Sequence, residues 1–144
     1  MKKTNLILLA IAIALTSLFS LSSCKKGTDD PVISLKTRKD RFTNTWTLNK
    51  YEKNGAQQDI SGTTYTYLVK NDGTLTQTIE GSIFGFATRS IREGTWTFQN
   101  DDEDVKITIG TNVEIYNLQR LATKELWLKN TTGSDTHVYY FDGL

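Results

Sequence analysis

His137 has the most versatile catalytic side chain in this 144-residue chain, which contains no other histidine. A histidine that acts as a general base needs a nucleophile or a bound water, and an acidic group that orients its ring. The sequence offers no recognisable set of this kind around His137, which lies next but one to Tyr139 in an alternating segment. We therefore expect a structural histidine, no catalytic residues and a protein that is not an enzyme.

Carboxylates are the other common source of acid and base chemistry. Glu80, Glu93 and Glu114 lie far apart in the sequence, and only the fold can bring such residues together. Their sequence spacing resembles no catalytic pair. Whether folding assembles them is left open by the sequence.

The acidic run 101–104 (DDED) offers oxygen ligands of the kind that calcium prefers. It lacks the alternating spacing of an EF-hand loop, and a solvated turn between two strands explains the same residues. Transition metals prefer cysteine and histidine ligands, and the chain has one of each, Cys24 and His137. We expect no metal site and no cofactor. The sequon Asn130-Thr131-Thr132 is best explained as turn composition.

Aromatic side chains are the strongest candidates for a ligand site, because ligand pockets are mostly apolar with a few polar groups. In a small domain the same residues can instead fill the core, and the two interpretations stay open. Phe84 and Phe86 flank Gly85, so their segment could form a lid over a cavity, plug one end of the fold or extend a strand. The candidate lining residues are Trp46, Tyr65, Tyr67, Phe84, Phe86 and Trp96.

The elements that must position these residues are strands. From residue 42 onward the side chains alternate, as where Val105, Ile107 and Ile109 are separated by Lys106 and Thr108. Alternation that is rich in threonine and aromatic residues predicts strands, and turn residues such as the NDG at 71–73 separate them. The longest gap between predicted strands, 81–91, has the length of a functional loop. The predicted strands are 43–53, 63–70, 74–80, 92–99, 104–109, 112–119, 124–130 and 135–142.

These strands predict an all-β fold, an antiparallel meander of about eight strands. Closing the meander into a small barrel removes its exposed edges and leaves room for side chains or one small ligand. A two-sheet sandwich buries one face of each strand equally well and remains the alternative. In either fold, Trp127 should face away from Leu126 and Leu128 and lie partly at the surface.

Four short segments resemble the lipocalin-like domain of Bacteroidetes lipoproteins. They are NTWTL (44–48), NDGT (71–74), GTWTF (94–98) and ELWLK (125–129), and the resemblance covers roughly residues 41–144. It implies a small calycin-type barrel. The chain departs from true lipocalins in having Asn44 where their first strand has glycine, and in lacking a last-strand arginine over Trp46.

The N-terminus is typical of an export signal. Lys2 and Lys3 precede a largely apolar run over 6–21, which is short for a membrane span of about 20 residues. The segment Leu21-Ser22-Ser23-Cys24 is similar to the lipobox of bacterial lipoproteins. This resemblance implies cleavage after residue 23 and attachment of several acyl chains, such as palmitate, to Cys24. An uncleaved signal anchor and an ordinary secretory signal are the alternatives.

We expect three parts: a signal peptide at 1–23, a lipidated Cys24 with a flexible tether to residue 41, and a barrel domain at 42–144. Without residues 1–23 the chain keeps 15 basic and 16 acidic residues, so nothing in its charge favours nucleic acid. Asp29-Asp30 is weakly similar to acidic surface-export signals, and a solvated linker explains it equally well.

Taken together, the sequence predicts a lipoprotein anchored in a bacterial cell envelope, most simply the outer membrane, facing the periplasm or the surface. Its barrel would bind a small apolar or glycan-derived ligand. The alternative is a structural or interaction subunit of an envelope or surface complex, with a protein partner and no small ligand. The oligomeric state is not predicted.

Overall fold

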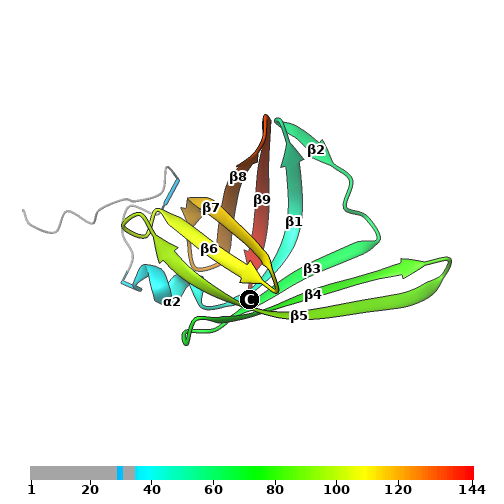
Figure 1. The fold of residues 1–144 in the computed structure, drawn as a ribbon, viewed down its shortest axis with the longest axis horizontal. Coiled ribbons are helices and arrows are strands. Elements are labelled where there is room, and N and C mark those ends of the chain that lie inside the picture. The colour runs from blue at the N-terminus through cyan, green and yellow to red at the C-terminus, as the bar shows by residue number, and fades with distance from the viewer. Residues whose placement is uncertain (1–28, 31–34) are drawn as a thin grey trace, which may run out of the picture.

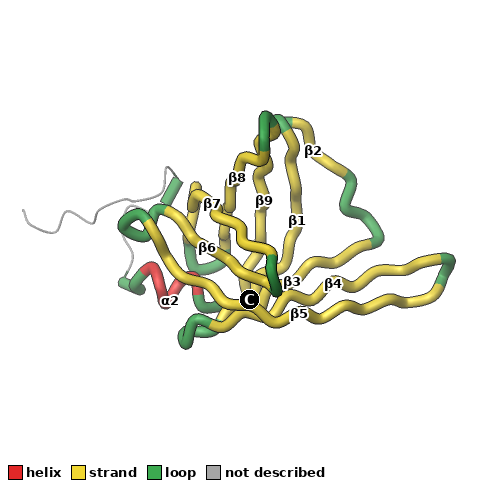
Figure 2. The backbone as a smooth tube through the Cα atoms, viewed as in Figure 1, coloured by secondary structure: helices red, strands yellow, loops and turns green. Residues whose placement is uncertain are grey.

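The computed structural model describes residues 29–30 and 35–144, and these residues form one nearly all-β domain. Figures 1 and 2 show a meander of strands curled around a central axis, with one short helix at one end and one long hairpin reaching out from the other. Cys24 and the predicted signal peptide lie outside the described residues. Among the residues described, no helix is long and apolar enough to cross a membrane.

One helix and nine strands follow one another along the chain. They are α2 (Arg38–Phe42), β1 (Thr45–Lys53), β2 (Ala56–Gln58), β3 (Thr63–Val69), β4 (Thr74–Ile83), β5 (Phe86–Gln99), β6 (Asp104–Ile109), β7 (Asn112–Leu121), β8 (Glu125–Thr132) and β9 (Asp135–Gly143).

The sheet closes on itself because the first long strand pairs with the last. All pairings are antiparallel, consecutive strands from β3 to β9 lie side by side, and β1 joins β3 to β9. The closing ladder runs from Trp46 opposite Gly143 to Lys53 opposite His137. The predicted eight-stranded antiparallel barrel is therefore confirmed, and the sandwich alternative is set aside. β2 is an added strand that pairs only with the end of β1.

The predicted strands agree with the observed ones within a few residues, apart from the segment 81–91. The prediction of a long loop there was wrong. β4 continues to Ile83 and β5 begins at Phe86, and the two strands stay paired up to the two-residue turn at Phe84 and Gly85. Serine, threonine and glycine hid the strand signal in this exposed part of the chain.

One end of the barrel is packed solid. Its interior is filled by buried residues that face inward from every long strand: Trp46, Val69, Leu75, Trp96, Val105, Leu118, Leu121, Leu126, Leu128 and Phe141. Phe42 at the end of α2 covers this core and contacts the ring of Trp96 at 4.8 Å between centroids. The Trp46 indole donates to the Phe42 carbonyl (2.9 Å), which fixes the helix over the barrel end. The tightly packed side chains fill the barrel interior at this end.

The segment before the barrel also contacts this closed end. Asp30 and Arg41 are both buried, although they lie in the range predicted as a flexible tether. The Asp30 carboxylate accepts a hydrogen bond from the Leu121 amide (2.6 Å) and forms an ion pair with Arg38. Burial lowers the pKa of the Arg41 guanidinium, and the nearby Asp30 charge opposes that shift. Asp29, Asp30 and residues 38–42 therefore belong physically to the barrel's closed end.

Two bulges change which residues face the interior. In β1 the register shifts between Leu48 and Lys50, so that Leu48 and Tyr51, three residues apart, both point inward. In β7 a similar shift between Leu118 and Arg120 brings Leu121 into the core. A bulge inserts one residue and moves the following side chains to the opposite face. Strict alternation therefore fails after each of them.

Candidate functional site

The open half of the barrel contains a cavity of about 310 Å³. It lies at the end opposite α2, and its lining side chains come from β1, β3, β4, β7 and β9 and from the loop before β3. Its walls are Leu48, Tyr51, Ile60, Tyr65, Tyr67, Gln77, Glu114, Tyr116, Tyr139 and Phe141. Half of these residues are tyrosines, so the walls combine apolar rings with hydroxyl groups.

The tyrosine rings are packed against one another. Tyr51 stacks on Tyr139 with ring centroids 4.9 Å apart, and Tyr116 meets Tyr139 edge-on at 5.9 Å. Tyr67 lies against Phe141 at 5.6 Å, where the cavity meets the core. Such contacts between aromatic rings limit side-chain freedom, so the walls are largely preformed.

Polar contacts hold the hydrophilic groups of the cavity in place. Gln77 donates from its side-chain amide to the Tyr67 hydroxyl (3.0 Å). The Glu114 carboxylate accepts hydrogen bonds from the Tyr116 hydroxyl and from the side chain of Asn112 (2.8 Å). Burial, together with the charges of Tyr51, Glu114 and Tyr67, raises the pKa of Tyr139 to about 12. Burial also raises the pKa of Tyr67.

A second, smaller pocket of about 180 Å³ adjoins this cavity. The two share Tyr67, Gln77, Glu114 and Tyr116, and the smaller pocket adds Arg92 with apolar residues of β4 and β6. Glu114 therefore lies on a wall common to both spaces.

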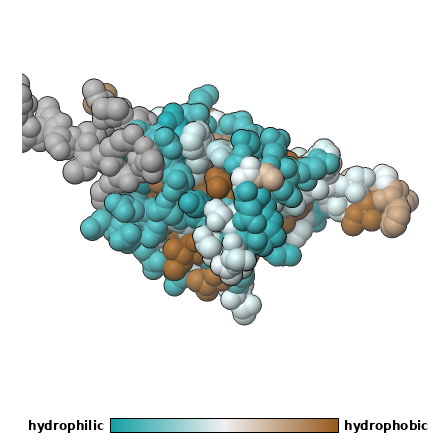
Figure 3. All heavy atoms as spheres, turned by 90° about the horizontal axis from the view of Figure 1, so that it is seen from above, coloured by the Kyte–Doolittle hydropathy of each residue, from teal (hydrophilic) through white to brown (hydrophobic). Residues whose placement is uncertain are grey.

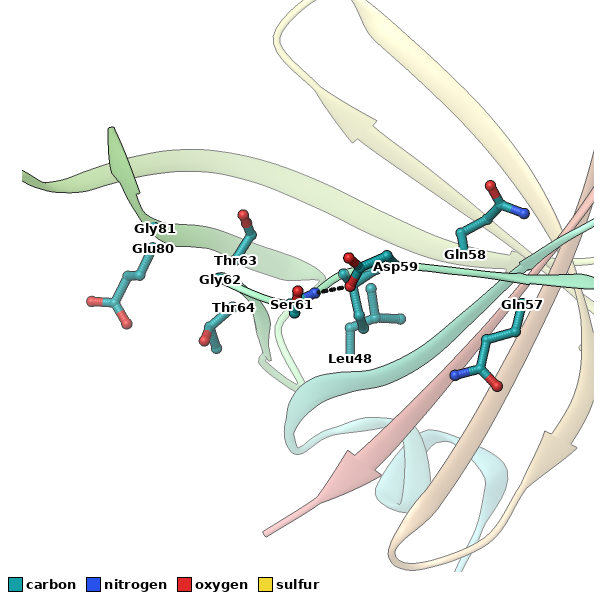
Figure 4. A pocket seen from close by; sticks show the side chains of 11 residues that line it. Leu48, Gln57, Gln58, Asp59, Ser61, Gly62, Thr63, Thr64, Glu80 and Gly81 are labelled. Carbon is teal, nitrogen blue, oxygen red and sulfur yellow. Dashed lines mark hydrogen bonds between the residues drawn. The ribbon is translucent and has the colours of Figure 1, made fainter. Parts of the chain in front are cut away.

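The cavity opens sideways between β1 and β3. These strands pair only from Thr45 to Thr47 and then diverge, because β1 continues along β9 while β3 continues along β4. A groove of about 710 Å³ fills the gap and shares Leu48 and Ile60 with the cavity. Figure 4 shows this groove, with Asp59 and Ser61 joined by a hydrogen bond on the segment that crosses it.

The predicted lining residues fall into three groups. Tyr65 and Tyr67 line the cavity, as the alternation of β3 places them inward. Trp46 and Trp96 are buried in the closed end and line no part of the cavity, so for them the core alternative is correct. Their indole nitrogens donate to the carbonyls of Phe42 and Lys70 (2.9 Å each), which identifies both as structural residues.

The third group, Phe84 and Phe86, does not form a lid. Both lie at the end of the β4–β5 hairpin, where Phe84 is 96% exposed and Phe86 is 77% exposed. Figure 3 shows the apolar end of this hairpin projecting from an otherwise largely hydrophilic surface. With Ile83 they form what we call the hairpin tip.

The other candidates for chemistry are not assembled into a site. The His137 Nδ1 lies 2.7 Å from the Tyr51 hydroxyl, and its ring stacks with that of Tyr51. Glu114 faces the barrel interior, while Glu80 pairs with Arg89 and Glu93 accepts a hydrogen bond from Thr76 on the outer face. Within the described residues, no group of three potential ligands could hold a metal ion.

The structure places the acidic run 101–104 in and beside a turn and Trp127 on the outer face of the barrel, so neither belongs to the cavity. Residues 101–103 of the acidic run lie in the turn between β5 and β6, where Asn100, Asp101 and Asp102 have positive φ, and Asp104 begins β6. Trp127 is half-buried on the outer face, with Arg120 above its ring and Tyr140 at its edge. Its orientation away from buried Leu126 and Leu128 confirms the expected alternation.

Sequence reasoning missed three of the cavity tyrosines as lining residues. Tyr51 is displaced by the bulge in β1, and Tyr116 and Tyr139 alternate correctly in β7 and β9. The signal for Tyr116 was available, since it lies two residues before buried Leu118. Leu48 and Tyr51 are three residues apart, which does not fit the two-residue period of a strand, so no such signal was available for Tyr51.

The fold has known relatives in structure. A lipocalin-like protein from Bacteroides uniformis superposes with a TM-score of 0.53 at 12% identity, covering 72% of this chain and 99% of that one. Japanin from Rhipicephalus appendiculatus, solved bound to cholesterol, superposes with a TM-score of 0.50 at 9% identity, covering 71% and 75%. At these identities the likeness shows the fold, a lipocalin-like barrel. No family model and no curated protein match the sequence.

Proposed function

We propose that this protein is a lipid-anchored lipoprotein of a bacterial cell envelope whose barrel binds a small molecule. The observation that carries the binding role is the tyrosine-lined cavity with its lateral opening. At about 310 Å³ it falls at the lower end of the range of ligand pockets, which suits a compact ligand. The solved complex of Japanin, a structural neighbour of this chain, with cholesterol supports the capacity of such barrels to bind a small molecule.

The anchoring role rests on the N-terminal sequence. Lys2, Lys3, the apolar run and the small residues before Cys24 have the order of a lipoprotein signal. One acyl chain binds a membrane only marginally, whereas two or more give a stable anchor. The chain enters the fold at the closed end, so a tether there would leave the cavity facing away from the membrane.

The anchor is tested by Cys24→Ala in the full chain expressed in a bacterium. Wild type should sediment with membranes and carry acyl groups on Cys24 by peptide mass spectrometry, and the variant should lose the acyl mass and the membrane association. Ser23→Ala, which keeps a small residue before the cysteine, serves as the matched control. An unmodified wild-type Cys24 would refute the anchor without touching the binding role.

The binding role is tested by native mass spectrometry of the protein purified from its own host, followed by extraction of the bound species. Ile60→Trp places a large ring where the groove meets the cavity and should abolish retention. Phe86→Trp, at the distant hairpin tip, should retain the ligand as wild type does. An empty wild-type protein that also binds no small-molecule probe would overturn the proposal.

A second role, as an interaction subunit of an envelope complex, is favoured by the hairpin tip. Two phenylalanines and Ile83 are exposed together there, and exposed apolar clusters often mark contacts with other molecules. Affinity purification from detergent-solubilised membranes should return a stoichiometric protein that is lost with the double variant Phe84→Ser and Phe86→Ser. Equal recovery with the variant, or no stoichiometric protein with wild type, would exclude this role for the tip.

A further inference from the structure

We propose that the cavity is built for a small organic cation, an ammonium group on a compact apolar body. This inference rests on the proposed binding function and specifies the chemistry of its ligand. It is argued from the rings, the one carboxylate and the charges that face the cavity.

The rings form a partial cage. Tyr51 and Tyr139 stack on one side, Tyr116 meets Tyr139 at a steep angle of 82°, and Tyr67 and Tyr65 face them from β3. The face of an aromatic ring carries negative electrostatic potential, which attracts ammonium groups and repels anions. Rings set at large angles to one another surround a cation on several sides. A site that binds a sugar by stacking a ring on its flat face would not need rings at large angles to one another.

In the part of the chain that the structure describes, Glu114 supplies the one carboxylate that lines the cavity. Its oxygens are held by Tyr116 and Asn112, which fix the direction of the negative charge. Among the described residues that line the cavity there is no lysine, arginine or histidine to pair with it. A cationic ligand would supply the missing positive charge.

The tyrosine hydroxyl groups add no charge to the cavity. Tyr67 and Tyr139 are neutral at physiological pH, because the ordinary tyrosine pKa of about 10 lies well above it and burial raises the pKa of both further. The cavity's negative charge is therefore concentrated on Glu114. Neutral phenol groups also remain available as donors to a polar group elsewhere on the ligand.

Arg92 limits where the cation can lie. This exposed side chain lines the smaller adjoining pocket together with Glu114, but it does not line the larger cavity. Like charges repel, so the ammonium group belongs in the larger cavity among Tyr51, Tyr116 and Tyr139. Removing the charge of Arg92 should not weaken binding of a cation.

Choline and 3,3-dimethylbutan-1-ol are suitable probes, because they share shape and hydroxyl group and differ in the central charge. Their affinities are compared by isothermal titration calorimetry with the full chain in a polyoxyethylene detergent. We expect choline to bind at least tenfold more tightly than its neutral isostere. Glu114→Gln should remove most of this preference, whereas Glu93→Gln, on the outer face, and Arg92→Gln should keep it. Thermal unfolding verifies that each variant is folded.

Each result decides between the two proposals. Equal or tighter binding of the neutral isostere would overturn the cation inference and leave the binding cavity intact. A charge preference that survives in folded Glu114→Gln would also overturn it, because the preference would come from elsewhere. If neither probe binds and no ligand is retained from the host, the binding function fails together with the inference.

Discussion

Gly94 shows how closely two strands of the barrel approach one another. It lies in β5 opposite Ile109 of β6, and a Cβ atom built on it would overlap the Thr108 carbonyl and stand 2.9 Å from the Ile109 side chain. The obstruction is largely backbone, which cannot rotate away. Glycine is therefore required here for packing and not for an unusual backbone angle.

Gly94→Ala should lower the free energy of unfolding by about 1–3 kcal/mol, the usual range for overpacking. Urea unfolding followed by tryptophan fluorescence measures it, since Trp96 lies two residues away in the core. Gly81→Ala is the matched control in the neighbouring strand β4, where the nearest atom is a loop carbonyl at 3.3 Å. An equal loss in both variants would contradict the packing argument.

Tyr139 makes the stability of the barrel depend on pH in the alkaline range. Its pKa of about 12 in the folded protein lies above the ordinary value of 10, so between these values the folded state keeps a proton that the unfolded state loses. The native state then binds more protons, and stability must fall as pH rises from about 10 toward 12. Denaturant unfolding at several pH values should show this fall, with a smaller slope for Tyr139→Phe. Parallel slopes would show that other groups account for it.

At the scale of elements, alternation alone predicted most of the barrel. Alternation predicted the strands that contain buried valine, leucine and tryptophan, because one face of each strand is apolar and the other face carries threonine or charged residues. β2 was not predicted because it is a short polar addition to the edge of β1, and residues 81–83 of β4 and 86–91 of β5 were not predicted because they bury little. Tyr65 and Tyr67 were predictable lining residues, whereas Tyr51 depended on a bulge that no pattern revealed.

The residue type at Phe84 in the hairpin tip does not suit the turn that it forms. Phe84 and Gly85 have φ values of 51° and 83°, which is the two-residue type I′ turn that favours Asn-Gly. A bulky residue with left-handed backbone is disfavoured by about 1–2 kcal/mol. An exposed phenylalanine retained at such a position is consistent with a contact role for the tip.

Phe84→Asn should therefore raise the free energy of unfolding, by about 0.5–1 kcal/mol, because asparagine tolerates this backbone conformation. Phe86→Asn is the control, since Phe86 is exposed but lies in a strand. Urea unfolding of the two variants provides the comparison. A loss of stability in Phe84→Asn would mean that the phenylalanine ring makes a stabilising contact within the hairpin.

At the scale of the whole molecule, the segment before the barrel is fastened to the bulge in β7. The Asp29 amide donates to the Gln119 carbonyl (2.9 Å), and Asp30 accepts from the Leu121 amide two residues further on. The ladder between β6 and β7 ends at Asn117, so these backbone groups of β7 are available to bond with the segment before the barrel. A composition typical of linkers thus forms a buried attachment, because the Asp30–Arg38 ion pair satisfies its charge.

Asp30→Ala should destabilise the fold by about 3 kcal/mol, since it leaves the largely buried side chain of Arg38 without its carboxylate. Asp29→Ala should have an effect below about 0.5 kcal/mol, because Asp29 is exposed and bonds through its backbone. Thermal and urea unfolding of the two neighbouring variants separates the roles. Similar small effects would indicate that the attachment contributes little to stability.

The ladder between β1 and β9 has a consequence for the order of events during synthesis. β1 is made first among the barrel strands, yet its longest ladder is with β9, whose residues are made last. Neighbouring hairpins can pair while the chain is still growing, but the ring cannot close until residue 143 has appeared. Long-range pairing of this kind is a late and slow step. Since Tyr51 and Tyr139 come from these two strands, the cavity comes into existence only with that final pairing, and an incomplete chain has nothing with which to hold a ligand.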